Sequence, residues 1–367
     1  MRILVVNWLD RENPLAGGAE IHLHETFSRM VQLGHEVTLL TSGWSGCDTR
    51  VDLDGIAVHR TGTRYTFSLA AVTYYLRHLS HESFDIVVED LNKVPLFTPY
   101  WTRSPIVLLV HHLFGLTAFG SARIPVASAT WLLERPIPWV FSNTPTIAVS
   151  ESTKEDLVKR GFHAEQIEVI PNGIDLDWYS PHPNHVRTKD PTVLYLGRLK
   201  KYKRVDLLLH AVNKLTQEGS RVTLKIAGTG DDRGRLESLC TKLGIGNEVE
   251  FMGYVSEERK LELLQTCWLH ALTSSKEGWG ISCIESSACG TPTVASDSPG
   301  LRESVVSGET GLLVPHGDQD RLASAIGSLL TDRQAREEMG RRARRFAERY
   351  SWDKSARAME DFLNRHT

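Results

Sequence analysis

The chain has 367 residues and a formal net charge of -3, with 41% hydrophobic and 24% charged residues. This length is long for one domain and sufficient for two, and the composition is that of an ordinary globular protein with a sizeable core. The slightly negative charge argues against broad electrostatic binding of nucleic acid, so we expect no nucleic-acid partner.

The N-terminal segment predicts the opening unit of a doubly wound α/β sheet. Residues 2–7 form a short β-branched run that favours a buried parallel strand. A loop ending in Gly17-Gly18, a helical pattern over about 19–33 and a strand over 37–40 follow. The glycine pair could hold phosphate or simply cap a turn, and it lacks the GxGxxG pattern of a dinucleotide site.

Strands and helices continue to alternate, and two histidines follow one of the strands. His111 and His112 come directly after a buried run over 106–110, at the carboxyl edge where open parallel sheets bind ligands. Adjacent side chains of an extended segment point in opposite directions, which disfavours a shared metal ion. Each histidine could instead belong to the core or the surface. The other elements of this half are expected at 55–59, 84–88 and 146–149 for strands and 67–79 for a helix.

Residues 113–142 are rich in apolar and aromatic side chains, with two arginines among them. One interpretation is an interfacial surface that dips toward lipid headgroups. The alternative is a helix packed against the N-terminal sheet. Three prolines interrupt the segment and disfavour a single long amphipathic helix. We expect a core helix together with an exposed loop on the acceptor side.

A change of domain is predicted near the middle of the chain. Ser152 and Glu155 fit a capping box for a helix that ends near Gly161. A strand over 167–170 is followed by the turn Pro171-Asn172-Gly173 and a linker-like stretch over 181–184.

The second half repeats the pattern of strand, glycine loop and helix. Strands are expected at 193–196, 222–227 and 249–252, and the loops after them contain Arg198 to Lys203, Gly228-Thr229-Gly230 and Gly253-Tyr254. The basic loop could be a solvated turn or could hold a diphosphate. Helices are expected at 205–215, 235–243, 319–330, 333–350 and 352–362.

The stretch 276–285 organises the chain. A strand over 268–272 leads into a loop with Gly278 and Gly280, and a helix follows over 281–288. A helix start behind a glycine loop presents free N–H groups, which bind anions. Glu277 lies in the loop before the helix and Glu285 lies inside it, so phosphate and sugar hydroxyls could both be held. The alternative is an ordinary strand–turn–helix with solvated glutamates.

Three segments in order carry a family resemblance, namely EGWGISCIE at 277–285, ACGTP at 288–292 and ETGLLV at 309–314. Together they resemble glycosyltransferase family 4, densely in the C-terminal half and thinly in the N-terminal half. The resemblance implies a GT-B fold, with two facing Rossmann-like domains and a C-terminal helix that crosses back to the first. The implied domains are an acceptor-side domain over 1–170 with 351–367, and a nucleotide-sugar-binding domain over 171–350.

The same resemblance implies roles for particular residues. Glu277 would bind hydroxyls of the transferred sugar, Glu285 would hold the ribose, and His112 would contact the donor sugar. Arg198 and Lys203 would stabilise the leaving diphosphate. The implied catalytic set is Glu277, Arg198, Lys203 and His112, and the implied donor-binding set is Gly17, Gly18, Asn172, Arg198, Lys203, Gly253, Tyr254, Glu277, Gly278, Trp279, Gly280, Ile281 and Glu285.

The expected function is that of a retaining glycosyltransferase that needs no metal and no cofactor. It would move a hexose from a GDP- or UDP-linked sugar to a glycan or lipid-linked acceptor. The alternatives are a nucleotide-sugar epimerase on the same fold and a non-catalytic nucleotide-sugar-binding protein. The five scattered cysteines and the strand-like N-terminus favour a cytoplasmic protein. A peripheral contact with the inner face of the membrane would run through 113–142.

Overall fold

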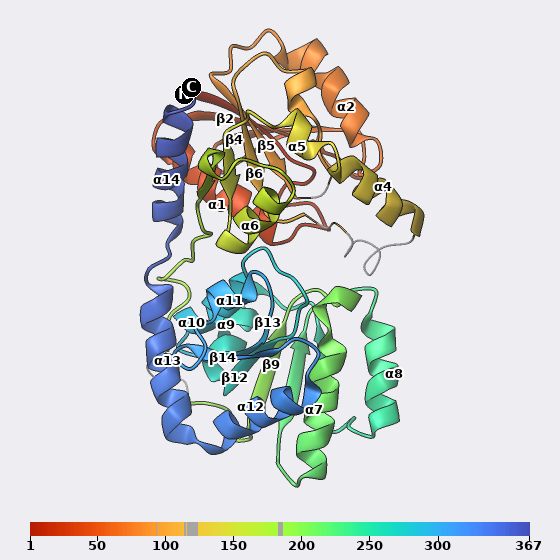
Figure 1. Ribbon diagram of the computed structural model, residues 1–367, viewed down its shortest axis with the longest axis vertical. Coiled ribbons are helices and arrows are strands. Elements are labelled where there is room, and N and C mark those ends of the chain that lie inside the picture. Colours follow the sequence, from red (N-terminus) through yellow and green to blue (C-terminus); the bar gives the residue numbers. More distant parts are fainter. Residues whose placement is uncertain (93, 114, 116–123, 183–185) are drawn as a thin grey trace. The chain divides into compact units, whose positions relative to one another are not determined.

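The computed structural model of the chain describes residues 1–92, 94–113, 115, 124–182 and 186–367 (Figure 1). The chain forms two compact units, one of Met1–Gly173 with Tyr350–Thr367 and one of Ile174–Arg349. Each unit is built on a predominantly parallel sheet with helices packed against it (Figure 1). The prediction of two Rossmann-like α/β domains is therefore confirmed.

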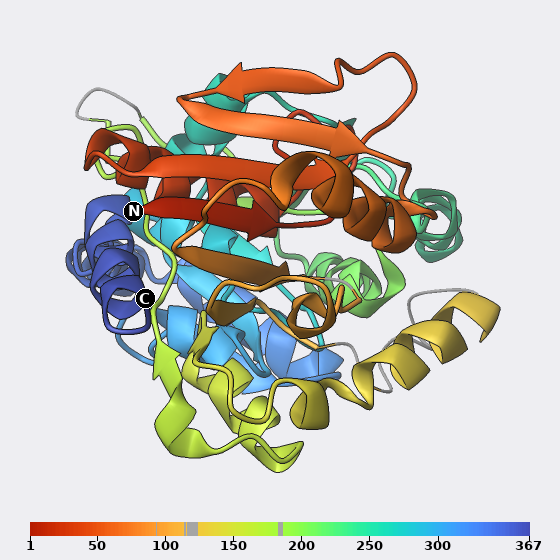
Figure 2. The same ribbon diagram turned by 90° about the horizontal axis from the view of Figure 1, so that it is seen from above.

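The sheet of the first unit has the strand order β3-β4-β2-β1-β5-β6-β7-β8, and Figure 2 shows the β3–β4 hairpin at one edge. That hairpin is antiparallel, and the other neighbouring pairs among the described strands are parallel. The sequence analysis missed β3, which is short and lies on the edge. The strands are β1 (Arg2–Val6), β2 (Glu36–Ser42), β3 (Arg50–Leu53), β4 (Ile56–Thr61), β5 (Ile86–Leu91), β6 (Ile106–Val110), β7 (Thr146–Ala148) and β8 (Ile167–Val169).

Both faces of this sheet are buried, as continuous apolar strands require. Ile3 and Val5 of β1 point into one core cluster and Leu4 and Val6 into another, because successive side chains of a strand face opposite sides. The helices are α1 (Gly18–Gln32), α2 (Phe67–Tyr74) with a π-helical turn (Tyr75–Leu79), α4 (Ile124–Glu134), α5 (Ile137–Val140), α6 (Glu151–Lys159) and α14 (Trp352–Asn364), with short 3-10 turns at Thr98–Tyr100 and Ala164–Gln166.

The C-terminal helix α14 belongs to the first unit, beside α1 (Figure 1). Its apolar positions follow the spacing of a helix with one buried face. Met359, Phe362 and Leu363 enter the same core cluster as Leu23 and Phe27 of α1. The expected return of this helix to the N-terminal domain is confirmed.

The segment over 113–142 divides between core and surface. Leu113, Ile137 and Phe141 are buried with side chains of β5, β6 and α6. On α4 and α5, Leu132 and Trp139 are exposed, Trp139 to 77%. Residues 114 and 116–123 lie outside the described part of the chain. The division between core and surface agrees with the expectation, but these exposed side chains lie on helices α4 and α5 and not on the expected loop.

The capping box expected at Ser152 and Glu155 is wrong. Helix α6 begins earlier, and Ser150 is its N-cap residue, whose Oγ accepts a hydrogen bond from the Thr153 N–H at 3.1 Å. Ser150 and Ser152 both lie near the start of the helix, so the sequence alone does not show which of them is the N-cap. Of the two, Ser150 has the extended backbone that an N-cap requires.

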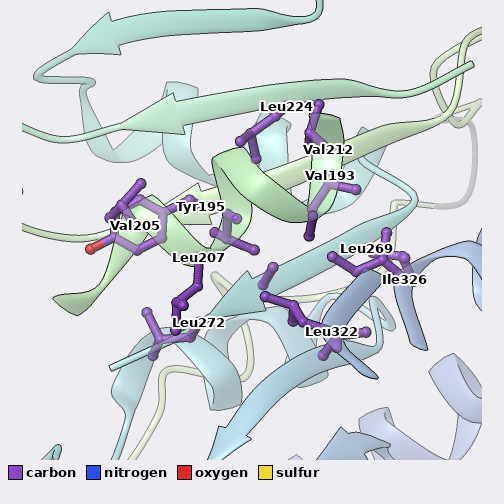
Figure 3. Close-up of a cluster of buried hydrophobic side chains, with 14 of the residues drawn as sticks. Val193, Tyr195, Val205, Leu207, Val212, Leu224, Leu269, Leu272, Leu322 and Ile326 are labelled. Atoms are coloured by element: carbon purple, nitrogen blue, oxygen red, sulfur yellow. The ribbon is translucent and has the colours of Figure 1, made fainter. Parts of the chain in front are cut away.

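The second unit has a parallel sheet with the order β11-β10-β9-β12-β13-β14. Its core lies between the sheet and the helices, and Figure 3 shows Tyr195 of β9 close to Val205 of α7, and Val193 of β9 close to Val212 of α7. The strands are β9 (Thr192–Leu196), β10 (Thr223–Ala227), β11 (Val249–Gly253), β12 (Leu269–Leu272), β13 (Thr293–Asp297) and β14 (Gly311–Pro315).

Helices flank this second sheet, and α7 packs against α12 while α10 packs against α13. Gln319 opens α12 behind the N-cap Asp318, and Arg333 opens α13 behind the N-cap Asp332. The helices are α7 (Val205–Gln217), α8 (Arg233–Leu243), α9 (Glu257–Thr266), α10 (Ile281–Ala288), α11 (Leu301–Ser304), α12 (Gln319–Thr331) and α13 (Arg333–Ala347), with a 3-10 turn at Lys201–Lys203.

Buried histidine makes the first unit sensitive to acid. His24 of α1 is buried, and neither ring nitrogen has a hydrogen-bond partner within the described residues. Burial, with Arg11 nearby, lowers the pKa of His24 to about 4. Because the folded state disfavours the protonated ring, the free energy of unfolding is highest above the unfolded-state pKa of about 6.5. It falls as the pH drops through the folded-state pKa of about 4, by roughly 3 kcal/mol in all.

We expect His24→Met to make the unfolding free energy fall less between pH 7 and pH 4, as measured by urea titration. The matched control is His163→Met, at an exposed position, which should keep the wild-type pH dependence. Equal pH dependence in wild type and His24→Met would contradict this account.

Candidate active site

The order of strands in the second unit creates a topological switch point beside β9. The chain leaves β9 for β10 and β11 on one side and then returns to β12 on the other side of β9. At such a switch point the loops after the two central strands diverge, and ligands bind outside the carboxyl ends of the strands. These loops are 197–204 after β9 and 273–280 after β12, and they carry Arg198, Lys203 and Glu277.

Hydrogen bonds to two backbone carbonyls of the first loop connect the two loops. Ser275 N–H donates to the Tyr202 carbonyl at 3.0 Å, and the Thr273 hydroxyl donates to the Arg204 carbonyl at 2.8 Å. Arg204 itself is in the left-handed region with φ 52°, and it closes the loop directly before α7. The crossing bonds fix where Lys203 and Glu277 stand relative to each other.

Lys203 and Glu277 form an ion pair at the centre of this edge. Lys203 Nζ lies 2.5 Å from Glu277 Oε1, and the side chains are only 12% and 14% exposed. Burial lowers the pKa of Lys203, but the charge and hydrogen bond of Glu277 together with Tyr202 outweigh it, and the net pKa is raised. Arg198 is exposed on the same loop, and its charge acts on Lys203 as well. The structure thus brings these three predicted residues to one place.

Glycines let the loops after β9, β10 and β11 pack backbone to backbone. A Cβ on Gly228 would lie 1.9 Å from the Gly197 carbonyl oxygen, and one on Gly230 would lie 2.1 Å from the Leu199 carbonyl oxygen. Gly228 N–H also donates to the Gly253 carbonyl at 2.7 Å. Tyr254, which follows, is 81% exposed. The predicted Gly253-Tyr254 pair therefore lies at the same sheet edge as Arg198 and its loop.

The loop before α10 packs against the segment that follows β13 and leads into α11. Glu277 N–H donates to the Pro299 carbonyl at 3.0 Å, and Trp279 is buried. Gly280 is the N-cap of α10 with φ 81°, and a Cβ there would meet Ser304 Oγ at 2.7 Å. Among the described residues no side chain caps this helix, and the Cys283 N–H donates to the Gly280 carbonyl at 2.9 Å, so the first-turn amides left for an anion are those of Ile281 and Ser282.

Glu285, one turn into α10, belongs to a charged cluster that the sequence did not reveal, in which Lys260 and Glu285 are largely buried and Glu257 is 59% exposed. Lys260 Nζ of α9 lies 3.0 Å from Glu285 Oε1 and 2.6 Å from Glu257 Oε2. The Tyr179 hydroxyl donates to Glu257 Oε2 at 3.0 Å. The spacing of Glu257 and Lys260 on one helix face was visible in the sequence, but their contact with α10 depends on tertiary packing.

The first unit has its own switch point, between β1 and β5. Gly17 is the N-cap of α1 there, and its N–H donates to Glu20 Oε2 at 2.7 Å. Asn92, after β5, donates to the other oxygen of Glu20 at 2.8 Å. The predicted Gly17-Gly18 turn is therefore tied to the carboxyl edge of this sheet.

The histidines after β6 differ in their surroundings. His111 is buried, and its Nε2 lies 3.0 Å from Asp90 Oδ1 at the end of β5. His112 is partly exposed, so it is the more accessible of the two to a ligand. Asn172 is buried in the first unit, and its Oδ1 has no hydrogen-bond partner among the described residues. Among all residues that the structure describes, His, Cys, Asp and Glu side chains form no group of three or more that could hold a metal ion.

Sequence comparisons place this arrangement in a known class of enzymes. The family model "Glycosyl transferases group 1" matches residues 180–346, and "Glycosyltransferase Family 4" matches residues 16–178. A D-inositol 3-phosphate glycosyltransferase of Xylanimonas cellulosilytica is 30% identical, over 94% of this chain and 91% of that protein. The chain belongs to the family 4 glycosyltransferases.

Solved structures agree on the GT-B fold. The sucrose-phosphate synthase of Thermosynechococcus elongatus superimposes with a TM-score of 0.85 at 20% identity, covering 99% of this chain and 98% of that one. Anabaena HepE in complex with UDP-glucose gives a TM-score of 0.78 at 21% identity, covering 99% of each chain.

Within the described ranges, no helix is both long and apolar enough to cross a bilayer.

Proposed function

We propose that this glycosyltransferase moves a hexose from a UDP- or GDP-linked sugar to a glycan or lipid-linked acceptor, with retention at the anomeric carbon and without a metal ion. The observation that carries the proposal is the buried Lys203–Glu277 pair, at the switch point of the second sheet and on the loop that leads into α10. A cation, a carboxylate and free helix amides at one edge match a diphosphate joined to a sugar.

Charge on the leaving group explains the basic residues. When the bond from the anomeric carbon to the diphosphate breaks, negative charge builds up on the phosphate oxygens. Lys203, Arg198 and the amides of Gly280 and Ile281 are donors that can stabilise this charge without rearranging. Fixed cations of this kind could replace a divalent ion.

Glu277 would bind the transferred sugar. With a diphosphate bound, Lys203 can donate to a phosphate oxygen while Glu277 accepts hydrogen bonds from sugar hydroxyls. In the proposed step the acceptor oxygen forms its bond to the anomeric carbon on the face from which the diphosphate departs. The acceptor proton passes to a phosphate oxygen of the leaving group, so no enzymatic nucleophile is needed.

The first unit would supply the acceptor side. We assign a sugar contact to His112, which is partly exposed, and a binding role to Gly17, Gly18 and Asn172. The exposed Leu132 and Trp139 support a peripheral contact with a membrane at its inner, cytoplasmic face. A lipid-linked acceptor would suit such a surface and would place the enzyme in polysaccharide or glycolipid biosynthesis.

Calorimetric titration with UDP, GDP and their sugar conjugates, with and without EDTA, tests the donor class. UDP is the first probe, because a protein of the same fold was crystallised with UDP-glucose. We expect one nucleotide to bind at least tenfold more tightly than the other, with no effect of EDTA. A donor that binds only in the presence of a metal, or no binding of either nucleotide, would overturn the proposal. NMR of the product's anomeric proton then reports retention or inversion.

A further inference from the structure

We propose that Lys260 is a positioning residue that prepares Glu285 to accept hydrogen bonds from the ribose of the donor. This inference rests on the proposed function and adds a residue that neither the motif nor its spacing indicates. Lys260 lies on α9, outside the stretch 276–285, and reaches Glu285 only through tertiary packing.

The geometry leaves Lys260 little freedom. Its Nζ lies 3.0 Å from Glu285 Oε1 and 2.6 Å from Glu257 Oε2, and the side chain is 14% exposed. Tyr179 closes the cluster, because its hydroxyl donates to Glu257 at 3.0 Å. A chain of hydrogen bonds thus runs from Tyr179 through Glu257 and Lys260 to Glu285.

Tyr179 is itself anchored by backbone contacts. Arg344 of α13 donates to the Tyr179 carbonyl at 2.8 Å and to the Ala288 carbonyl, at the end of α10, at 2.9 Å. Gln265 of α9 donates to the Ser180 carbonyl at 2.7 Å. Helices α9, α10 and α13 therefore hold both ends of the chain of hydrogen bonds, and the cluster is fixed before any ligand arrives.

The charges in the cluster show what Lys260 contributes. Burial lowers the pKa of Lys260, but Glu285 and Glu257 together raise it further, so the amine stays protonated. Two carboxylates share one cation. Without that cation, Glu285, whose side chain is 9% exposed, would lose the partner that holds its carboxylate in place, and a nearly buried carboxylate without its partner is unfavourable.

A Glu285 carboxylate that is no longer held in place would be a poor ribose ligand. A carboxylate accepts hydrogen bonds at both oxygens, and two neighbouring ribose hydroxyls offer two donors. Both bonds form together only when the carboxylate is correctly oriented. Lys260 would therefore act on ribose recognition through Glu285, and the diphosphate and sugar contacts of Lys203 and Glu277 would be unaffected.

A comparison of two ligands on two proteins tests this role. Wild type and Lys260→Met are titrated with UDP and with 2′,3′-dideoxy-UDP, or with the GDP pair if wild type selects GDP. Hydrogen bonds to a charged group lead us to expect wild type to prefer the hydroxylated nucleotide by roughly 10- to 100-fold. In Lys260→Met the preference should fall to about threefold or less, with the dideoxy affinity nearly unchanged. Lys214→Met, at an exposed ion pair with Asp320, is the control and should keep the full preference.

The outcomes separate this inference from the proposed function. A full preference for UDP in Lys260→Met would overturn the role of Lys260, and so would an equal loss of affinity for both nucleotides, which indicates a structural defect. In Lys260→Met, KM for the donor should rise while kcat changes by less than about threefold. If wild type binds neither nucleotide, the proposed function fails first.

Discussion

Replacing Lys203 with methionine should lower kcat by roughly 100- to 1,000-fold, the range seen when one fixed donor is removed from a developing negative charge. The change would remove the cation that we propose for the diphosphate, and it would leave Glu277, which is only 14% exposed, without its Lys203 partner. Binding of the intact donor should weaken less, because the diphosphate gains its additional negative charge only as the bond to the sugar breaks. Single-turnover kinetics with saturating donor measure the effect.

Lys200 provides the matched control, because it lies on the same loop. Its Nζ lies 2.8 Å from Asp231 in a surface pair whose side chains are 33% and 67% exposed, and such pairs contribute little. Lys200→Met should keep kcat within about twofold of wild type. If Lys200→Met and Lys203→Met are impaired equally, the loop acts through its overall charge and the specific role of Lys203 is wrong.

The sequence was sufficient for the architecture because the strands are buried on both faces. Runs such as Ile3 to Val6 and Val193 to Leu196 are continuously apolar, and glycines mark the loops at their ends. Those loops carry Arg198, Lys203, Gly253 and Glu277, which the structure does bring to one sheet edge. A loop that follows a parallel strand has its place fixed by the strand, so spacing along the chain was informative.

Contacts between helices could not be predicted from the sequence. Lys260 and Glu285 are separated by a whole strand and loop, and nothing in the local pattern distinguishes Lys260 from a lysine on a solvated face. The choice between His111 and His112 was open for a similar reason, since only the position of Asp90 shows which ring is buried. The hairpin strand β3 was missed because a short edge strand has few buried side chains to set its period.

Replacing Gly228 with alanine should destabilise the second unit by roughly 2–6 kcal/mol, the combined range for backbone strain and overpacking. Gly228 has φ +142°, a region that favours glycine, and an added Cβ would lie 1.9 Å from the Gly197 carbonyl oxygen. That atom belongs to backbone and cannot turn aside as a flexible side chain can. The loop that carries Arg198 must move, so kcat/KM should fall as well. Calorimetric unfolding and steady-state kinetics measure the two effects.

Gly246→Ala is the matched control, because a Cβ at that position has no atom within 4 Å. This exposed change should alter stability by less than about 0.5 kcal/mol and leave kinetics as in wild type. A stable and fully active Gly228→Ala protein would contradict the close packing of the loops after β9 and β10. An unstable protein with normal kcat/KM below its unfolding temperature would mean that Arg198 does not depend on that packing. Loss of both is expected, because the contact that limits the size of residue 228 is made by the backbone that positions Arg198.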